Sequence, residues 1–351
     1  MEKFEKNMKG IVLHGGHGTR LRPLTHTGPK QLLPIANKPM SQYCIESMKE
    51  TGITEIAIIV GGTGSNKVRE YYGSGEKFGA SFTYIEQDEP KGIAHAIRLC
   101  KEFVNDEKFL VFLGDNIIQK SIKDFVENFN KSDYDATVLL CEVDNPSRFG
   151  IADVENKKII KITEKPKKPT SNLAVTGIYL LTPLIFEVID NLKPSWRNEL
   201  EITDALDNLL KQNDNIGYET ITDYWKDTGT PEDILNANRQ VLDHITHKQK
   251  CIFDESLGKL LNLPRMETSI IGKNCKIDES TLIGPHVSIG DDTIISSGVV
   301  IENSIIMSGC KIDGGLNIKD SIISANCHLY GNNKDKTKKL FLLGEGTKIT
   351  L

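Results

Sequence analysis

Short apolar runs alternate with amphipathic helical patterns through the first two-thirds of the chain. The apolar runs that predict buried strands cover residues 10–16, 54–62, 81–87 and 108–116. The helical patterns between them cover residues 40–52, 65–73 and 92–104. Strands that alternate with helices are usually joined by right-handed crossovers, so the pattern predicts an α/β fold around a mostly parallel sheet.

The predicted strands end in small or polar residues. The ends read Gly15-Gly16, Gly61-Gly62, Glu86-Gln87 and Gly114-Asp115-Asn116. In a parallel sheet the ligand lies at the carboxyl ends of the strands. We therefore expect a polar ligand at this edge.

The last third of the chain follows a different period. Isoleucine occupies positions 271, 277, 283, 289, 295 and 301, six residues apart each time, and Ile312 and Ile318 resume the spacing after a slip of one residue. A hexapeptide period is typical of a parallel β-helix, in which short strands turn corners and stack coil upon coil. We expect a small left-handed parallel β-helix of about nine hexads, which make about three coils.

These two patterns divide the chain into three parts. We expect an α/β domain over residues 1–245, a connecting segment over residues 246–268 and a β-helical domain over residues 269–351. The connecting residues show no clean period of their own.

Charge and hydropathy exclude several classes of protein. The net charge of the 351 residues is −5, whereas nucleic-acid-binding domains usually carry a basic surplus. No apolar stretch approaches the roughly 20 residues of a membrane span, and the charged start of the chain lacks the apolar core of a signal peptide. We therefore expect a cytoplasmic protein that binds neither nucleic acid nor membrane. The scattered cysteines contain no C-x-x-C pair, and we expect them to be reduced and mostly buried.

The stretch LHGGHGTRLRPLT, at residues 13–25, combines a pliable backbone with positive charge. Glycines after a strand let backbone N–H groups approach phosphate oxygens, Arg20 adds a planar fork of donors, and Lys30 adds a point charge. Two common phosphate fingerprints fail, because the dinucleotide pattern needs glycine at Leu21 and a P-loop after the second strand needs glycine at Asn66. These residues alone leave open either a phosphate site or a tight turn with surface charge.

Several further stretches of the sequence bear on the role of residues 13–25. GGHGTRLRPLTHTGPKQLLPIANKP, YIEQDEPKGIAHA, FLGDN, EKPKKPTSNLAVTGIY, PSWRNELEITDAL and YWKDTGT together resemble the signatures of the sugar-1-phosphate nucleotidylyltransferase family. The resemblance covers nearly the whole chain, including the β-helical tail, and implies a Rossmann-like first domain. It also implies that a sugar-1-phosphate oxygen attacks the α-phosphorus of a nucleoside triphosphate and expels pyrophosphate. Such a transfer depends on in-line positioning and charge neutralisation.

The resemblance implies a role for individual residues. Asp115 and Asp227 would hold one Mg²⁺, which prefers the hard oxygens of carboxylates and phosphates. The residues implied to act on phosphate are Arg20 and Lys30 for the triphosphate and Lys165 and Arg197 for the sugar phosphate. The residues implied to bind the nucleotide are Leu13, Gly15, Gly16, Gly18, Thr19, Gln31, Gln87, Pro90, Gly92 and Asp115. The residues implied to bind the sugar are Gly150, Glu164, Val175 and Trp225.

The choice of base is a finer question. Gln31 and Gln87 match the amide pair that reads a pyrimidine edge, since an amide offers both a donor and an acceptor. The whole pattern favours dTTP with glucose-1-phosphate. Uridylyl transfer to glucose- or N-acetylglucosamine-1-phosphate is the alternative. His14 replaces the small residue usual in the family, and it is interpreted as a side chain within the strand layer, a nucleotide contact or a metal ligand.

The tail admits other interpretations. Hexapeptide β-helices are also the fold of many acyltransferases, but we expect few coils, and His286 and His328 are isolated as candidate bases. We favour a tail that shields one end of the first domain or forms the interface of a homo-oligomer. Its removal beyond about residue 245 is then expected to leave the chemical site intact. A non-catalytic binding protein is a further alternative, which the presence of both carboxylates and of the Arg20 and Lys30 pair disfavours.

Overall fold

The computed structural model describes residues 8–16, 18–213, 215–246, 268–331 and 337–351. The chain forms two compact units, each of which is discontinuous in sequence. The first consists of Met1–Gly16 and Ser41–Asp227, and the second of His17–Met40 and Thr228–Leu351. The early segment that contains Arg20 and Lys30 therefore belongs to the same unit as the C-terminal part. The predicted connecting segment 246–268 lies almost wholly outside the described residues.

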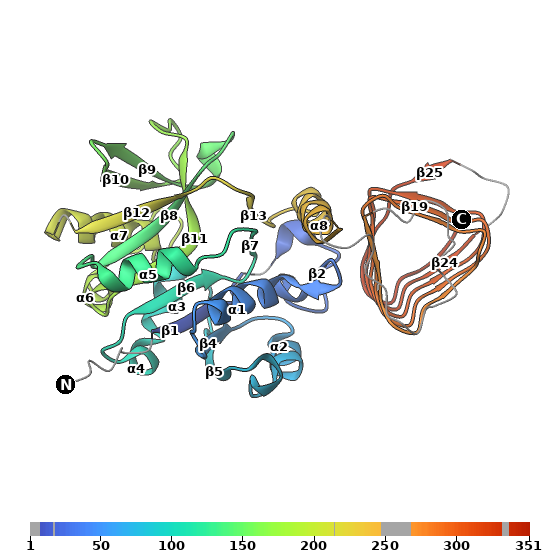
Figure 1. Ribbon diagram of the computed structural model, residues 1–351, viewed down its shortest axis with the longest axis horizontal. Coiled ribbons are helices and arrows are strands. Elements are labelled where there is room, and N and C mark those ends of the chain that lie inside the picture. The colour runs from blue at the N-terminus through green and yellow to red at the C-terminus, as the bar shows by residue number, and fades with distance from the viewer. Residues whose placement is uncertain (1–7, 17, 214, 247–267, 332–336) are drawn as a thin grey trace. The chain divides into compact units, whose positions relative to one another are not determined.

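A mixed sheet forms the centre of the first unit (Figure 1). Its strands are β1 (Lys9–Leu13), β4 (Glu55–Val60), β5 (Ser81–Glu86), β6 (Phe109–Leu113), β8 (Ala136–Glu142), β9 (Gly150–Glu155), β10 (Lys158–Glu164), β11 (Leu173–Leu181) and β12 (Ile216–Ile221). The order is β10-β9-β11-β6-β1-β4-β5, and β8 joins β12 to β11. The strands β6, β1, β4 and β5 are parallel, as predicted, and β11 runs antiparallel to β6.

Helices pack against this sheet. They are α1 (Met40–Glu50), α2 (Ser65–Tyr72), α3 (Ile93–Arg98), α4 (Lys101–Val104), α5 (Lys123–Lys131), α6 (Leu184–Asp190) and α7 (Ile202–Asn213), with 3-10 turns η3 (Glu76–Phe78) and η4 (Pro146–Arg148). The prediction of one continuous helix over residues 92–104 was wrong. The structure has two helices there, α3 and α4, with a break at Leu99 and Cys100. None of the described helices is long and apolar enough to cross a bilayer.

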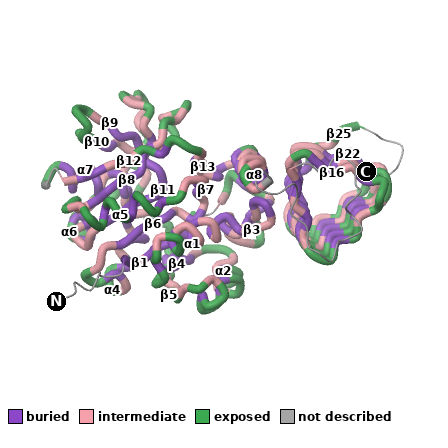
Figure 2. Tube along the Cα trace, viewed as in Figure 1, coloured by how far each residue is buried: buried purple, intermediate pink, exposed green. Residues whose placement is uncertain are grey.

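The central strand β1 is buried on both faces. Ile11 and Leu13 join the core cluster that includes residues of α3, α6 and α7. Gly10 faces α1, where an added Cβ would lie 2.7 Å from Sδ of Met48. The neighbouring strands β4 and β6 are buried in the same way (Figure 2). This two-sided burial is typical of parallel sheets, and it fixes the carboxyl ends of β1, β4 and β6 at one edge.

The second unit contains a three-sided parallel β-helix, the left-handed architecture expected from the hexad period (Figure 1). One sheet contains β14 (Ser269–Ile271), β17 (Val287–Ile289), β20 (Ile305–Ile306), β23 (Ile322–Ile323) and β26 (Leu342–Leu343). A second contains β15 (Lys276–Ile277), β18 (Ile294–Ile295), β21 (Lys311–Ile312), β24 (His328–Tyr330) and β27 (Lys348–Thr350). The third contains β16 (Leu282–Ile283), β19 (Val300–Glu302), β22 (Asn317–Lys319) and β25 (Lys338–Lys339).

The estimate of about three coils was too low, since two of these sheets have five strands each within the described residues. The coils also differ in length. Ile271 pairs with Ile289, 18 residues later, whereas Ile289 pairs with Ile306, 17 residues later. The shortened corner lies between Ile301 and Ile306 and contains Asn303, which has a left-handed backbone (φ 42°). This corner accounts for the slip in the isoleucine spacing.

The remaining elements of the second unit precede or adjoin the β-helix. They are η1 (Thr19–Leu21), η2 (Lys30–Leu32), β2 (Pro34–Ile35), β3 (Lys38–Pro39) and α8 (Pro231–Thr246). Thr230 caps the start of helix α8, since the Asp233 N–H donates to Oγ1 of Thr230 and that hydroxyl donates to the carboxylate of Asp233. This fixes the entry of the chain into α8.

The cysteines follow the prediction where the structure describes them. Cys44, Cys100, Cys275, Cys310 and Cys327 are buried thiols, and Cys141 is a partly buried thiol. None of these six forms a disulfide within the described ranges. Cys251 lies outside the described residues.

Candidate functional site

The two predicted metal carboxylates lie beside each other in the first unit. Strand β7 (Asn116–Ile118) pairs antiparallel with β13 (Trp225–Asp227), and Asn116 is the direct partner of Asp227. Asp115 immediately precedes Asn116. The short ladder therefore brings together two carboxylates that are more than a hundred residues apart in sequence.

The side chain of Asn116 links these residues. Its Nδ2 donates to Oδ1 of Asp115 at 3.0 Å, and its Oδ1 accepts from Nε1 of Trp225 at 2.7 Å. Asn116 is 2 % exposed, so this amide is a fixed part of the interior. Trp225 also packs edge-on against Phe149, with ring centroids 5.6 Å apart. The sequence showed FLGDN as a motif, but only its aspartate was singled out.

The donor set at this ladder fits a hard divalent cation. Within the residues that the structure describes, no group of three or more His, Cys, Asp or Glu side chains could hold a metal. Asp115 and Asp227 would thus supply only two side-chain ligands. Mg²⁺ is usually bound by one or two carboxylates, with water and substrate phosphate completing its shell.

Gln87 lies against the glycine turn that follows β1. Its Nε2 donates to the Gly92 carbonyl at 3.2 Å and lies 3.0 Å from Nδ1 of His95. Its Oε1 lies 3.7 Å from the point that a Cβ on Gly15 would occupy. Burial lowers the pKa of His95, and Arg98 lowers it further, so its Nδ1 can accept. In the tautomer that carries the ring hydrogen on Nε2 of His95, both amide hydrogens of Gln87 are used within the protein, which leaves the oxygen as an acceptor facing Gly15.

Two glycines allow close approach here. Gly16 has φ of 96° with no described atom within 4 Å of an added Cβ, so its left-handed conformation leaves open space beside the backbone. Gly92, with φ of 101°, lies against Leu200, whose carbonyl oxygen would be 2.4 Å from an added Cβ. Only glycine fits at position 92. Pro90, also predicted to bind nucleotide, is exposed next to this turn.

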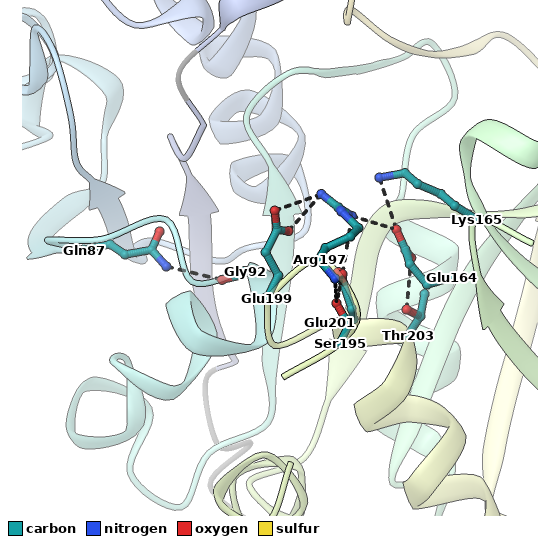
Figure 3. Close-up of polar contacts among 9 residues, drawn as sticks. All are labelled: Gln87, Gly92, Glu164, Lys165, Ser195, Arg197, Glu199, Glu201 and Thr203. Atoms are coloured by element: carbon teal, nitrogen blue, oxygen red, sulfur yellow. Dashed lines mark hydrogen bonds and ion pairs between the residues drawn. The ribbon is translucent and has the colours of Figure 1, made fainter. Parts of the chain in front are cut away.

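A cluster of charged side chains gathers around Arg197 (Figure 3). The members of this Arg197 cluster are Glu164, Lys165, Arg197, Glu199 and Glu201. The Arg197 guanidinium lies 3.3 Å from Glu164, 2.9 Å from Glu199 and 3.4 Å from Glu201. Lys165 lies 3.2 Å from Glu164. Three carboxylates thus face two cations, and the predicted phosphate-binding residues Lys165 and Arg197 occupy one site.

Glu164 is held in a fixed orientation. It is the register partner of Gly150 across β9 and β10, and its Oε2 accepts from Oγ1 of Thr203 at 3.0 Å. An added Cβ on Gly150 would lie 2.5 Å from the Thr203 methyl group and 3.3 Å from Oε2 of Glu164. Glycine at 150 therefore gives Thr203 room to reach Glu164. Val175, the remaining predicted sugar residue, is buried in β11 at 7 % exposure.

Glu201 is the most buried acid of the cluster. Its side chain is 5 % exposed, and Oγ of Ser195 donates to it at 2.9 Å. Burial raises the pKa of Glu201, and the carboxylates of Glu164 and Glu199 raise it further, while Ser195 and Arg197 oppose this shift. Glu201, Glu199 and Thr203 were not singled out in the sequence, although the stretch ELEITD that contains them was.

The other predicted phosphate residues belong to the second unit. Thr19 and Arg20 lie in η1, where both are exposed, and Lys30 lies in η2. Gly18, with φ of 57°, precedes η1, and its carbonyl accepts from Oγ1 of Thr25 at 2.8 Å. Gln31, predicted to read the base, is buried at 1 % exposure.

His14 is buried at the end of β1 with 1 % exposure. Neither ring nitrogen has a hydrogen-bond partner among the residues that the structure describes, and the ring meets Tyr72 edge-on at 6.0 Å. Burial lowers the pKa of His14 to about 3, although Asp115 opposes the shift. Of the three interpretations, these contacts favour a side chain that points into the layer between sheet and helices.

With this geometry established, the comparisons with known proteins decide the family. Residues 9–244 match the family model described as nucleotidyl transferase, and residues 265–350 match the one described as GMPPB C-terminal domain. The chain belongs to the nucleotidyl transferase family. The first match spans both carboxylates and the whole Arg197 cluster.

Relatives support this assignment over the full length. The chain is 38 % identical over 357 residues to a glucose-1-phosphate thymidylyltransferase from Streptomyces antibioticus, covering 98 % of this chain and 99 % of that one. It is 48 % identical over 244 residues to the low-salt glycan biosynthesis nucleotidyltransferase Agl11 of Haloferax volcanii, covering 69 % and 68 %. A crystal structure titled a putative glucose-1-phosphate thymidylyltransferase from Bacillus anthracis, in complex with a sucrose, has a TM-score of 0.64 and 45 % identity, covering 66 % and 94 %. This protein is thus a sugar-1-phosphate nucleotidyltransferase.

Proposed function

We propose that the enzyme transfers a thymidylyl group from dTTP to glucose-1-phosphate, giving dTDP-glucose and pyrophosphate. A phosphate oxygen of the sugar phosphate forms a new bond to the α-phosphorus of dTTP. The bond from that phosphorus to the bridging oxygen of pyrophosphate breaks, and the electron pair leaves with pyrophosphate. The full-length similarity to a thymidylyltransferase supports this choice of substrates.

The Arg197 cluster is the observation that carries the proposal. A sugar phosphate has hydroxyl donors at one end and a dianion at the other. Glu164 offers carboxylate oxygens beside Gly150, and Lys165 and Arg197 stand next to it as cations. Hydroxyl groups bind well to a fixed carboxylate, and phosphate binds the planar fork of arginine. The cluster can therefore bind the hydroxyl end and the phosphate end of the sugar phosphate through different groups.

The orientation of Gln87 supports a pyrimidine with a ring N–H. Because both amide hydrogens are used within the protein, its oxygen accepts from the base. Thymine and uracil carry a donor at N3, whereas the corresponding nitrogen of cytosine is an acceptor. The site would then leave Gln87 and cytosine with two facing acceptors, which is costly when buried. UTP shares the N3–H and remains the second candidate nucleotide.

Asp115 and Asp227 would hold Mg²⁺, which when bound supplies charge neutralisation for the phosphates of the substrate. Asn116 fixes the orientation of the first carboxylate, because it donates to that group and is itself held by Trp225. Arg20 and Lys30 would add cationic charge for the departing pyrophosphate. The protein's share of catalysis is thus to position two anions and to neutralise them.

Pyrophosphate release across a grid of nucleoside triphosphates and sugar-1-phosphates tests the proposal. We expect the maximum with dTTP and glucose-1-phosphate, and almost no release by Glu164→Gln with that pair at low substrate. A maximum with UTP would retain the mechanism and replace the nucleotide. Release with no pair, from a folded protein supplied with Mg²⁺, would refute the proposed reaction.

A further inference from the structure

One face of the β-helix differs from the others. In the sheet of β14, β17, β20, β23 and β26, the inner column belongs to the β-helical core, so the adjacent residues point outward. The outer residues of the three middle strands, Ser288, Ile305 and Ile322, are nevertheless only 0–1 % exposed. In the next sheet the outer residue Ile294 is 37 % exposed. Something within the second unit covers the first face.

The contacts identify the cover as α8 and the early segment 18–40. From α8, Asp243 lies 2.8 Å from Nε2 of His286, at the corner before β17. From the early segment, Nδ2 of Asn37 donates to the Ile289 carbonyl at 2.6 Å. At the far end of the face, a Cβ added to Gly344 would lie 3.1 Å from the Pro23 carbonyl oxygen. The early segment therefore touches this face near β17 and again after β26.

Asn238 joins all three components. This α8 residue is 1 % exposed, and its Oδ1 accepts both from Oγ of Ser288 at 2.7 Å and from the Ala36 N–H at 2.8 Å. One buried oxygen thus connects α8, the β-helix and the early segment. Buried hydrogen bonds of this kind specify a single arrangement, because breaking them leaves unpaired groups in the interior.

The backbone at this junction is unusual. Ala36 and Asn37 form the turn between β2 and β3, and both have left-handed φ angles, 47° and 61°. An alanine in this region costs about 1 kcal/mol or more and persists where its surroundings fix it. The Ala36 N–H bonds to Asn238, and the Asn37 side chain bonds to the coil, so both turn residues are held from outside.

We propose that the β-helix positions the phosphate-binding segment of the enzyme, with Asn238 as the positioning residue. Arg20 and Lys30 lie on this same segment, in η1 and η2. Phosphoryl-transfer chemistry depends on placement, and a misplacement of about 1 Å can cost a hundredfold in rate. That the segment binds phosphate rests on the proposed function. That the β-helix holds the segment in place rests only on contacts within the second unit.

The same contacts revise the expectation for the tail. The segment that contains Arg20 is not independent of the coils, because Ile289 and Ser288 both take part in fixing its turn, directly or through Asn238. Removal of the β-helix would take away Ser288 and the Ile289 carbonyl, which bond to Asn238 and Asn37, and would release the segment. We therefore expect truncation after residue 245 to impair triphosphate use, in place of the earlier expectation that the chemical site stays intact.

The test compares Asn238→Leu with two further variants of the full-length chain. Asn238→Asp retains an oxygen that can accept from both donors, so it is the conservative rescue. Thr281→Val is the matched control, since Thr281 is a buried coil hydroxyl that donates within the β-helix, to the Ser296 carbonyl. Hydrogen–deuterium exchange of residues 18–40 and steady-state kinetics with dTTP and glucose-1-phosphate are measured for each.

Asn238→Leu is expected to speed exchange in residues 18–40 and to lower kcat/KM for dTTP about tenfold, with the KM for glucose-1-phosphate unchanged. Asn238→Asp should restore most of the slow exchange and most of the kcat/KM for dTTP. Thr281→Val should alter neither the exchange nor the kinetics. Unchanged exchange and unchanged dTTP kinetics in a folded Asn238→Leu would overturn the inference. Faster exchange in a protein whose wild type releases no pyrophosphate with any substrate would refute the proposed function and keep the positioning.

Discussion

Two regions of this enzyme contain the cations that we propose to bind phosphate, and they hold these cations by different means. Arg197 is fixed by charge, with three carboxylates within 3.4 Å of its guanidinium. Arg20 and Lys30 are carried on a segment fixed by backbone turns and by burial against the β-helix. In the first case the groups that orient the cation also compete with its ligand. In the second case the groups that hold the segment, the Asn238 amide and the Ile289 carbonyl, carry no charge.

This difference has consequences for binding. In the proposed reaction, a sugar phosphate would have to displace a carboxylate from Arg197 before it could form its own paired bonds. Interactions between partly exposed charges are weakened by salt and by changes of pH. Packing against apolar coils carries no charge that salt could screen or pH could remove. The acceptor side of the reaction should therefore respond to ionic conditions more strongly than the triphosphate side.

The largest loss of activity is expected at the proposed metal site, because neither set of cations can replace a bound Mg²⁺. Asp115→Asn should reduce pyrophosphate release about a thousandfold, because a metal that neutralises charge in the transition state loses a ligand. The Mg²⁺ concentration needed for half-maximal activity should rise at the same time. Asp144→Asn, at an exposed position of the same unit, is the control. Normal turnover by Asp115→Asn would remove the metal assignment.

Replacing one cation from each region tests the comparison directly. Arg197→Met leaves Glu201 and Glu164 without their shared partner and should lower the free energy of unfolding by about 2 kcal/mol, after allowance for partial exposure. Arg20→Met should leave the free energy of unfolding unchanged, since Arg20 is exposed. Both variants should lose activity, which chemical denaturation and pyrophosphate release measure separately. Equal stability of the two variants would contradict the distinction.

His14 sharpens the comparison, because it is a buried titratable group that lacks the compensation given to Glu201. Its pKa in the folded protein is about 3, against an ordinary value of 6.5, so protonation favours the unfolded chain. The wild type should lose stability as the pH falls below about 6.5 and continue to do so down to about 3. His14→Leu should lack this loss and gain about 2 kcal/mol relative to wild type between pH 7.5 and pH 5. Urea denaturation at both pH values measures it, and parallel pH profiles would disprove it.

The smallest effect is expected at the competing carboxylate. Glu199→Gln removes one of the charges that hold Arg197 and should lower the KM for glucose-1-phosphate about threefold at low salt. The difference should shrink as salt is added. Glu89→Gln, which breaks an exposed ion pair with Lys91, is the matched control. A KM that rises in Glu199→Gln would show that this acid assists binding.

The sequence predicted the elements more completely than the contacts. Strands β1, β4 and β6 were predicted because each is an apolar run that is followed by glycine. The coil count was too low because the inner column changes character: Leu329 replaces isoleucine, and Ile318 pairs with Lys339 only after a longer coil. Periodicity detects repeats only while their length and composition persist.

The missing parts of the site have one physical reason. Asn116, Thr203 and Asn238 act through hydrogen bonds to segments far away in the chain, and nothing in their local spacing marks them. Asn238 in particular lies on an ordinary amphipathic helix. Such residues can be found only when tertiary contacts are known.

The attachment of the early segment at both ends of one face also bears on how this tail can evolve. Repeat proteins commonly gain or lose whole repeats, since each repeat contacts only its neighbours. Here Asn37 is bound near β17 and Pro23 lies beside the residue after β26, three strand steps away. Each added coil would shift one attachment by about 4.8 Å relative to the other. The segment can therefore keep both attachments only at a fixed number of coils. Duplication of an internal coil would break one attachment unless the segment lengthened with it.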